Sequence, residues 1–303
     1  MTKANASLPG CVGAVGMFDG VHRGHRELLR VLVGQARSRG ALPVAFTFPS
    51  HPLALISPAS APALMSLPHE KEVLLRECGV EEVVFLDFPA VRSLSGREFL
   101  CLLREKYGVE ALVVGFNNHF GCDRMHAAEA ARIAGETGVE IILAGEYLLP
   151  DGEDVSSSRV RKALLEGDVD HAALMLGRPY GVRGRVVGGR RLGRTIGFPT
   201  ANLDCGCAAL LIPAPGVYAV DVRIGDMEGT FRGMMNIGRR PTVDTSADAA
   251  ISLEVNVFDL DADLYGRSVR VDFLKRLRGE RTFAGLDALR TQLEADREAA
   301  RSV

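Results

Sequence analysis

The stretch VGAVGMFDGVHRGH, residues 12–25, places a short apolar run directly before a glycine-rich loop that carries two histidines. Residues 12–18 are predicted to form a buried strand, and the spacing of apolar residues over 25–39 predicts a helix. Free N–H groups at a helix N-terminus attract phosphate. The imidazoles of His22 and His25 can therefore donate hydrogen bonds to a phosphoryl group that gains charge in a transition state. The alternative is a surface loop with two solvated histidines.

Further apolar runs and helical patterns alternate after this stretch. The predicted strands cover 43–48, 82–86, 111–114 and 140–143, and the predicted helices cover 68–78, 97–107 and 127–137. Strands that alternate with helices indicate βαβ units, which predicts an α/β domain around a parallel sheet. In such a sheet the ligand lies beyond the carboxyl ends of the strands, so we look for the chemistry there.

The periodicity changes after Tyr180. Glycine-rich turns separate segments of period two at 216–224, 229–237, 251–258 and 269–274, which predicts a compact antiparallel barrel or sandwich. Two short helices, 157–166 and 169–176, lead into this half, and an amphipathic helix over 284–300 closes it. We therefore predict two domains, residues 1–180 and 181–303.

The composition is that of a globular chain with little net charge. Its 303 residues include 36 Lys and Arg and 38 Asp and Glu, a net charge of −2 that disfavours a broad electrostatic grip on nucleic acid. No apolar run approaches the ~20 residues that a membrane span requires, and the first ten residues lack a secretory signal pattern. We expect a cytoplasmic protein with small-molecule partners, no nucleic acid and no membrane, whose six cysteines are reduced thiols.

Two further segments fit the site after the first strand. The run TFPSHP, residues 47–52, places His51 at the carboxyl edge of the sheet. The run SSSRVR, residues 156–161, opens a helix with three hydroxyls, and Arg161 can add a bidentate phosphate contact. A serine-rich helix start is also an ordinary N-cap, and on its own that interpretation is the stronger one.

The second half has its own candidate site. Residues 184–197 combine glycines and arginines, which suits polyphosphate, although no Gly-Lys-Ser/Thr of a Walker loop follows. The next segment offers the Thr200 hydroxyl and the Asn202 carbonyl, oxygen ligands of the kind that Mg²⁺ prefers. The alternative for residues 184–197 is an ordinary β-turn that carries arginines on its surface. In the alternating strand 251–257, Glu254 lies on the polar face, and phosphoryl transfer to an alcohol needs such a carboxylate to orient and deprotonate the hydroxyl.

Taken together, these motifs resemble a known family. Residues 16–25 (GMFDGVHRGH) with 156–161 look like the HxGH nucleotidylyltransferases, which have a Rossmann-like fold. The form FDGVH with TFPSHP is more specific, and is similar to the adenylyltransferase module of bacterial bifunctional riboflavin kinase/FAD synthetases. Residues 197–203 (GFPTANL), 236–242 (NIGRRPT) and 264–266 (LYG) follow in the order of the riboflavin kinase signature. The likeness covers about 12–297.

The resemblance implies roles for individual residues of the first site. His22 and His25 would bind the ATP phosphates as catalytic residues. The residues implied in nucleotide binding are Gly16, Phe18, Asp19, Gly20, Ser156, Ser157, Ser158 and Arg161. His51 and Asn117 would contact FMN.

In the second site, the resemblance implies a kinase. Glu254 would be the catalytic base, Thr200 and Asn202 would hold Mg²⁺ with ATP, and Arg278 would lie near the flavin. The residues implied in nucleotide binding are Gly184, Gly188, Gly193, Gly197 and Thr200.

The resulting hypothesis is a bifunctional enzyme that uses ATP, Mg²⁺ and flavins. The barrel would phosphorylate riboflavin to FMN, and the α/β domain would join FMN to the AMP part of a second ATP, giving FAD and pyrophosphate. The alternatives are a kinase alone, a nucleotidylyltransferase for another phosphate ester, and a flavin-binding scaffold with inactive sites.

Overall fold

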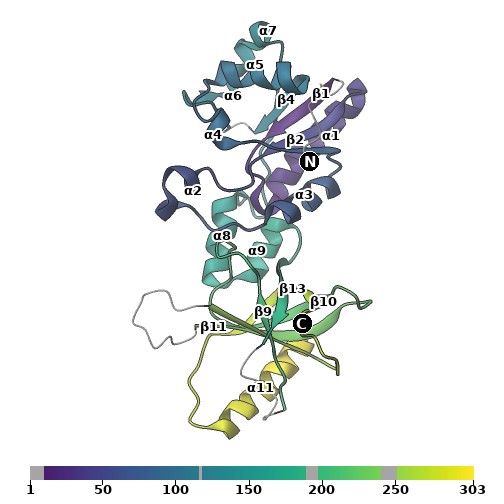
Figure 1. Ribbon diagram of the computed structural model, residues 1–303, viewed down its shortest axis with the longest axis vertical. Coiled ribbons are helices and arrows are strands. Elements are labelled where there is room, and N and C mark those ends of the chain that lie inside the picture. Colours follow the sequence, from purple (N-terminus) through teal and green to yellow (C-terminus); the bar gives the residue numbers. More distant parts are fainter. Residues whose placement is uncertain (1–9, 116–117, 189–196, 240–250) are drawn as a thin grey trace. The chain divides into compact units, whose positions relative to one another are not determined.

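A computed structural model describes residues 10–115, 118–188, 197–239 and 251–303 of the chain (Figure 1). The chain divides into two compact units, Met1–Ser157 and Ser158–Val303. This division lies after the first residue of helix α8 (Ser157–Glu166) and before α9 (Val169–Leu176), whereas the predicted domain boundary lies after both helices. The boundary of the two activities at 180/181 stays a prediction. None of the helices described is both long and apolar enough to cross a membrane.

The N-terminal unit is built on five parallel strands in the order β3-β2-β1-β4-β7. They are β1 (Cys11–Val15), β2 (Leu42–Thr47), β3 (Glu82–Phe85), β4 (Val109–Gly115) and β7 (Glu140–Ala144). The predicted α/β fold is confirmed. The strand order reverses between β1 and β4, and a reversal of this kind opens a ligand crevice beyond the carboxyl ends of the two strands.

Helices cover both faces of this sheet (Figure 1). On one face, Val12 and Ala14 of β1 pack with α1 (Arg23–Arg39) and α3 (Pro68–Glu77). On the other, Cys11 packs with α5 (Gly96–Tyr107) and α6 (Ala127–Arg132). The alternation of β1 side chains between two apolar layers explains why all its residues are apolar or glycine.

Several elements differ from the prediction. The helix expected over 127–137 breaks at Ile133, where α6 ends and α7 (Ala134–Thr137) begins. Short elements also fill the connections: η1 (Asp19–Val21), α2 (Leu53–Ile56), η2 (Pro58–Ser60), α4 (Phe88–Val91), β5 (His119–Phe120) and β6 (Met125–His126). The predicted strand 12–18 ends at Val15, and it could not have reached residue 18, because the backbone of Phe18 is left-handed.

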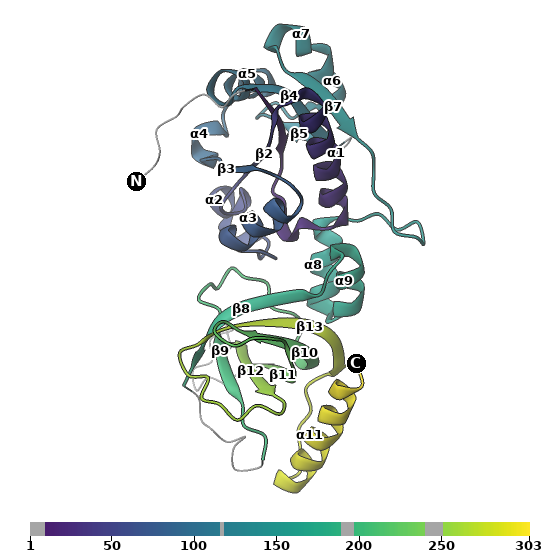
Figure 2. The same cartoon turned by 90° about the vertical axis from the view of Figure 1, so that its right-hand side faces the viewer.

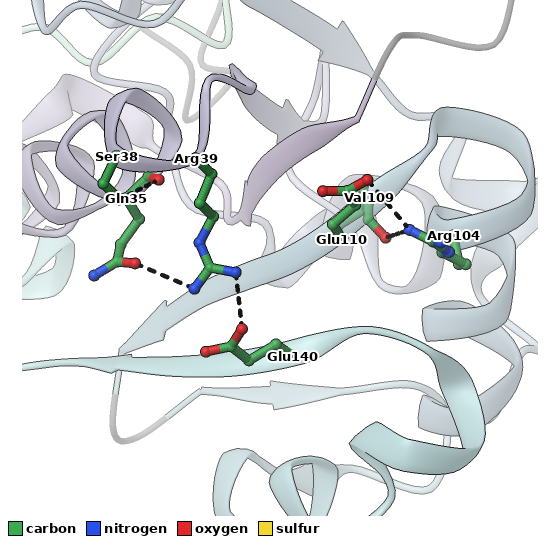
Figure 3. Close-up of polar contacts among 7 residues, drawn as sticks. All are labelled: Gln35, Ser38, Arg39, Arg104, Val109, Glu110 and Glu140. Carbon is green, nitrogen blue, oxygen red and sulfur yellow. Dashed lines mark hydrogen bonds and ion pairs between the residues drawn. The ribbon is translucent and has the colours of Figure 1, made fainter.

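The amino ends of the strands carry surface ion pairs, at the edge of the sheet opposite the predicted site (Figure 3). Arg39, at the end of α1, donates to Glu140 of β7 at 2.8 Å and to Gln35 at 3.3 Å. Arg104 of α5 lies 3.9 Å from Glu110 of β4. The hydrogen bond from Arg39 lowers the pKa of Glu140. These exposed pairs contribute little to stability.

The C-terminal unit contains a closed antiparallel barrel with the strand order β10-β11-β12-β9-β8-β13 (Figure 2). The strands are β8 (Tyr180–Val187), β9 (Ala201–Asp204), β10 (Gly216–Ile224), β11 (Phe231–Arg239), β12 (Ile251–Val257) and β13 (Ser268–Arg278). Tyr218 and Phe273 are fully buried and meet edge to face at 5.3 Å. The terminal helix α11 (Leu286–Arg301), yellow in Figure 2, packs on Val217 and Met234 through Ala300. The predicted barrel is confirmed, although β8 and β9 were not expected as strands.

The C-terminal end of helix α8 is tied to the barrel of the same unit. The Ala214 N–H donates to the Leu164 carbonyl oxygen at 3.0 Å, and Arg276 of β13 donates to the Glu166 carbonyl oxygen at 3.1 Å. The Arg276 guanidinium also packs against Gly167, where a Cβ would lie 2.8 Å from it. The C-terminal end of α8 therefore receives its capping contacts from the barrel.

Candidate active sites

The loop between β1 and α1 has an unusual backbone. Phe18, Gly20 and Val21 have φ values of 46°, 72° and 41°. Positive φ is unfavourable for a β-branched residue such as Val21, and it persists only where the surroundings enforce it. Here Phe18 and Val21 are both buried in the core of the unit. The loop is therefore held rigidly at the carboxyl end of β1, at the reversal of strand order.

His22 and His25 lie face to face at the start of α1. Their ring centroids are 3.6 Å apart with an angle of 17° between the planes, and the edge of Phe18 meets His25 at 5.3 Å. The Nδ1 atom of His22 accepts a hydrogen bond from the His25 backbone N–H at 3.3 Å. Because Nδ1 accepts, Nε2 of His22 carries the proton that it can donate. A Cβ on Gly24 would lie 3.2 Å from the His22 ring, so glycine permits this arrangement.

Asp19 holds the loop in place. Its buried carboxylate accepts from the backbone N–H groups of Met65 at 2.9 Å and Ser66 at 3.0 Å, and from the Ser66 hydroxyl at 3.2 Å. The Ser66 hydroxyl in turn accepts from the Gly20 N–H at 3.0 Å. These contacts fix the loop through Asp19, and the predicted contact of Asp19 with the nucleotide stays a prediction. Gly16 lies against the Phe18 ring, which a Cβ there would meet at 3.2 Å.

The serine-rich motif begins beside the histidine loop. A Cβ on Gly24 would lie 3.3 Å from the Val155 carbonyl oxygen, which brings the next residue, Ser156, near the start of α1. Ser157 begins α8 and ends the N-terminal unit. Ser158 and Arg161 belong to the C-terminal unit, so their place at this site stays a prediction.

Of the two residues predicted to contact FMN, the structure describes only His51. His51 follows the carboxyl end of β2, and its Nδ1 accepts from the Leu53 N–H at 3.2 Å. Asn117 lies outside the described residues. Its neighbour Asn118 donates to the Val15 carbonyl oxygen at 3.4 Å. The segment after β4 is thereby tied to the end of β1, the two strands that flank the crevice.

Glu254 lies in the middle of a polar row on the barrel. Asn202 of β9 and Asn236 of β11 are its direct partners across the antiparallel pairs, so the three side chains share one face. The Thr200 hydroxyl lies 3.5 Å from the Glu254 carboxylate. Met234, on this same face of β11, packs with α11, so the row lies on the outside of the barrel. Hydroxyl, amide and carboxylate oxygens thus gather where the sequence predicted Mg²⁺.

Two contacts position the segment that carries Thr200. The Asn256 amide donates to the Pro199 carbonyl oxygen at 2.6 Å. Arg297 of α11 lies over the ring of Phe198 at 5.4 Å, and that ring is almost completely buried. The prediction included neither Asn236 nor Asn256. The alternation of 251–257 places Asn256 on the face of Glu254, although the prediction did not count it as a site residue, and the same alternation within β11 could have found Asn236.

The structure describes three of the four glycines that were predicted to bind the nucleotide in the kinase site. Gly184 lies in β8, where a Cβ would be 2.4 Å from the Asp204 carbonyl oxygen, so close strand packing requires it. Gly188 follows β8 near Tyr265, Gly197 has a φ of 83° in a turn, and Gly193 lies outside the described residues.

Arg278, at the end of β13, forms an ion pair with Asp296 of α11 through its Nε and Nη2 atoms at 2.8–3.1 Å. Its guanidinium also lies 5.5 Å from the Phe283 ring. Its described contacts therefore join the barrel to α11, and its predicted contact with flavin stays a prediction.

Known proteins match both halves of the chain. Residues 4–159 match the family model described as FAD synthetase, and residues 176–303 match the one described as riboflavin kinase. A bifunctional riboflavin kinase/FMN adenylyltransferase of Pseudomonas fluorescens is 40% identical, over 97% of this chain and 93% of that protein. Proteins of the same name from Escherichia coli K12 and Bacillus subtilis are 39% and 32% identical, over 98% and 95% of this chain and 94% and 91% of theirs.

A solved structure shows the same architecture. It is a Streptococcus pneumoniae protein named a macrolide-efflux protein, with a TM-score of 0.88 and 35% identity, and the match covers 99% of this chain and 96% of that one. The matches to both family models and to full-length relatives confirm the predicted family and its two-step activity. The chain therefore belongs to the family of bifunctional riboflavin kinase/FMN adenylyltransferases, and it converts riboflavin to FMN and FMN to FAD.

Proposed function

We propose that each of the two reactions has its own site, one in each compact unit. Riboflavin is phosphorylated on the polar row around Glu254, and FMN is adenylylated at the loop that carries His22 and His25. The observation that carries this proposal is the reversal of strand order beside the His22–His25 pair in one unit, together with the oxygen-rich row in the other.

In the kinase reaction, Glu254 accepts the proton of the riboflavin 5′-hydroxyl as that oxygen attacks the γ-phosphorus of ATP. Thr200 and Asn202 provide the oxygen ligands that would hold Mg²⁺, and the carboxylate beside them is compatible with a divalent cation. A bound Mg²⁺ supplies neutralisation of phosphate charge. Asn256, through the Pro199 carbonyl, keeps the Thr200 segment against β12.

In the adenylylation reaction, a phosphate oxygen of FMN attacks the α-phosphorus of ATP in line, and pyrophosphate leaves. The substrate supplies the nucleophile, so the protein's contribution is positioning and charge stabilisation. The protonated Nε2 of His22 and the imidazole of His25 donate to the phosphate oxygens. The hydroxyls of Ser156 and Ser157, which belong to the same unit as the histidines, add donors to the same phosphates. Both sites take small molecules, in keeping with a net charge of only −2.

Two single variants of the full chain test the assignment. Loss of the Glu254 base costs roughly 10²–10⁴ in rate, so Glu254→Ala should stop FMN formation and still make FAD from supplied FMN. Loss of one transition-state donor costs about 10²–10³, so His25→Ala should show the opposite pattern. Separation of the flavins by chromatography measures both. Loss of both activities in either variant, with folding intact, would contradict one site per unit.

A further inference from the structure

Lys71 is a fully buried lysine on α3, the helix that covers the sheet beside α1. Its ammonium group donates to the Phe48 carbonyl oxygen at 2.9 Å and lies 3.5 Å from the Thr47 hydroxyl. Both residues are at the carboxyl end of β2. The side chain therefore reaches from the helix to the edge of the sheet where the ligand crevice opens.

The contacts of Lys71 continue into the histidine loop. The Thr47 hydroxyl donates to the Met17 carbonyl oxygen at 3.0 Å, two residues before Asp19. The segment that leads into α3 holds the same loop from its other end, because Ser66 bonds both Asp19 and Gly20. Helix α3 and its lead-in thus fix the loop at Met17 and at Asp19–Gly20, directly before His22.

The buried ammonium group of Lys71 is also influenced by the charge of Asp19 in the loop. Burial lowers the pKa of Lys71 to about 8, and the negative charge of Asp19 opposes that shift. A methionine of similar length would fill the same space without the desolvation cost of an ammonium group. A lysine here instead contributes a charge-assisted hydrogen bond to the Phe48 carbonyl oxygen and a positive charge that the negative charge of Asp19 stabilises.

We propose that Lys71 is a positioning residue for adenylylation, which fixes the His22–His25 loop to the end of β2 and thereby places the imidazoles at the ATP phosphates. The proposal rests on the assignment of adenylylation to this loop. Lys71 does not touch the substrates in this scheme. It acts through Thr47 and the backbone of the loop, where a displacement of about 1 Å can lower a rate 10²-fold.

The test compares three variants of the full chain: Lys71→Met, Thr47→Val and Leu75→Ala. The first two cut the contact chain with nearly unchanged volume. Leu75 is fully buried one turn further along α3 and shares an apolar core with Phe18 and Val21 of the loop, but a leucine side chain makes no hydrogen bond. Its truncation is therefore a control for lost apolar packing, as opposed to the loss of the polar contacts of Lys71 and Thr47. Each variant is assayed for adenylylation, for riboflavin phosphorylation as an internal control, and for its melting temperature.

We expect Lys71→Met to lower kcat of adenylylation roughly 10²-fold and Thr47→Val roughly 10-fold. The KM for ATP should change less than threefold, because the imidazoles stabilise the transition state more than the bound substrate. Riboflavin phosphorylation should stay within twofold in both, and Leu75→Ala should lower the melting temperature without this loss of kcat. If Lys71→Met fails to fold, Thr47→Val alone decides.

Three results would overturn the proposal: adenylylation within threefold of the parent in both contact-chain variants, an equal loss of kcat in Leu75→Ala, or a rise in KM with kcat unchanged. His25→Ala, assayed in parallel, tests whether adenylylation takes place at this loop at all. If His25→Ala retains adenylylation activity, the assignment of the reaction to the loop is wrong. If His25→Ala loses the activity but Lys71→Met and Thr47→Val retain it, the assignment stands and the positioning role of Lys71 is wrong.

Discussion

The ion pair between Arg278 and Asp296 is expected to hold the terminal helix on the barrel, and Asp296→Asn tests this. The two side chains are 10% and 4% exposed, and three N–O distances between them are 2.8–3.1 Å. Gln292 donates to the same carboxylate at 2.8 Å. The substitution keeps the shape of the side chain, but it leaves the Arg278 charge buried without its counter-ion.

Loss of one partner of a buried ion pair costs about 3–5 kcal/mol. For a unit of about 150 residues, a change of 1 kcal/mol shifts the melting temperature by roughly 3 °C. The melting temperature of the C-terminal unit should therefore fall by about 9–15 °C. The double variant Arg278→Met with Asp296→Leu should recover much of this loss, because an apolar pair carries no desolvation penalty.

The assay follows the temperature at which half of the riboflavin-phosphorylating activity is lost, with circular dichroism alongside. Phosphorylation reports on the barrel, and adenylylation from supplied FMN reports on the other unit. At 20 °C the KM for riboflavin should stay within twofold in Asp296→Asn. A shift below about 2 °C would refute the reasoning, and a large rise in KM without a shift would instead favour the predicted contact of Arg278 with flavin.

Other predictions test single features of the two units. Gly184→Ala should cost about 1–3 kcal/mol by overpacking β8 against β9, and an unchanged melting temperature with a raised KM for ATP would contradict this. The pKa of Lys71 lies at about 8, below its usual value, so the unfolded chain binds more protons above that pH. The stability of the N-terminal unit should therefore rise between pH 8 and about 10.5, a rise that denaturant titrations of Lys71→Met should lack. Glu140→Gln, which removes the exposed pair with Arg39, should change the free energy of unfolding by less than about 1 kcal/mol in the same titrations. Asn117→Ala should raise the KM for FMN through a lost polar partner and leave riboflavin phosphorylation unchanged, as steady-state kinetics of both reactions would show.

The strands and helices of the α/β unit could be predicted because burial on both faces of a parallel sheet leaves a clear pattern. The end of β1 was placed three residues late, since Phe18 is apolar but its left-handed backbone depends on the surrounding core. Strand β8 was missed for a different reason. Its alternation is present in the sequence, but the arginines and Gly184 between the apolar residues also suit a phosphate loop.

The residue types of the two sites were predictable, whereas their partners were not. Asp19 meets Ser66, and Lys71 meets Phe48, across 47 and 23 positions of the chain, and no local pattern encodes such a pairing. The polar face of β12 was recognised by its alternation. That Ser252 and Asn256 on this face are buried follows only from the tertiary structure.

The division between Ser157 and Ser158 has a consequence for anyone who wishes to separate the two activities by cutting the gene. A fragment that ends at 157 loses Ser158 and Arg161. A fragment that ends at 180 keeps them, but it strips α8 and α9 of the partners that now cover them, among them the donors from Ala214 and Arg276. The apolar sides of these helices would then face water and favour aggregation. On the predicted role of Ser158 and Arg161 in adenylylation, no single cleavage point would both keep these residues and leave α8 covered by its present partners.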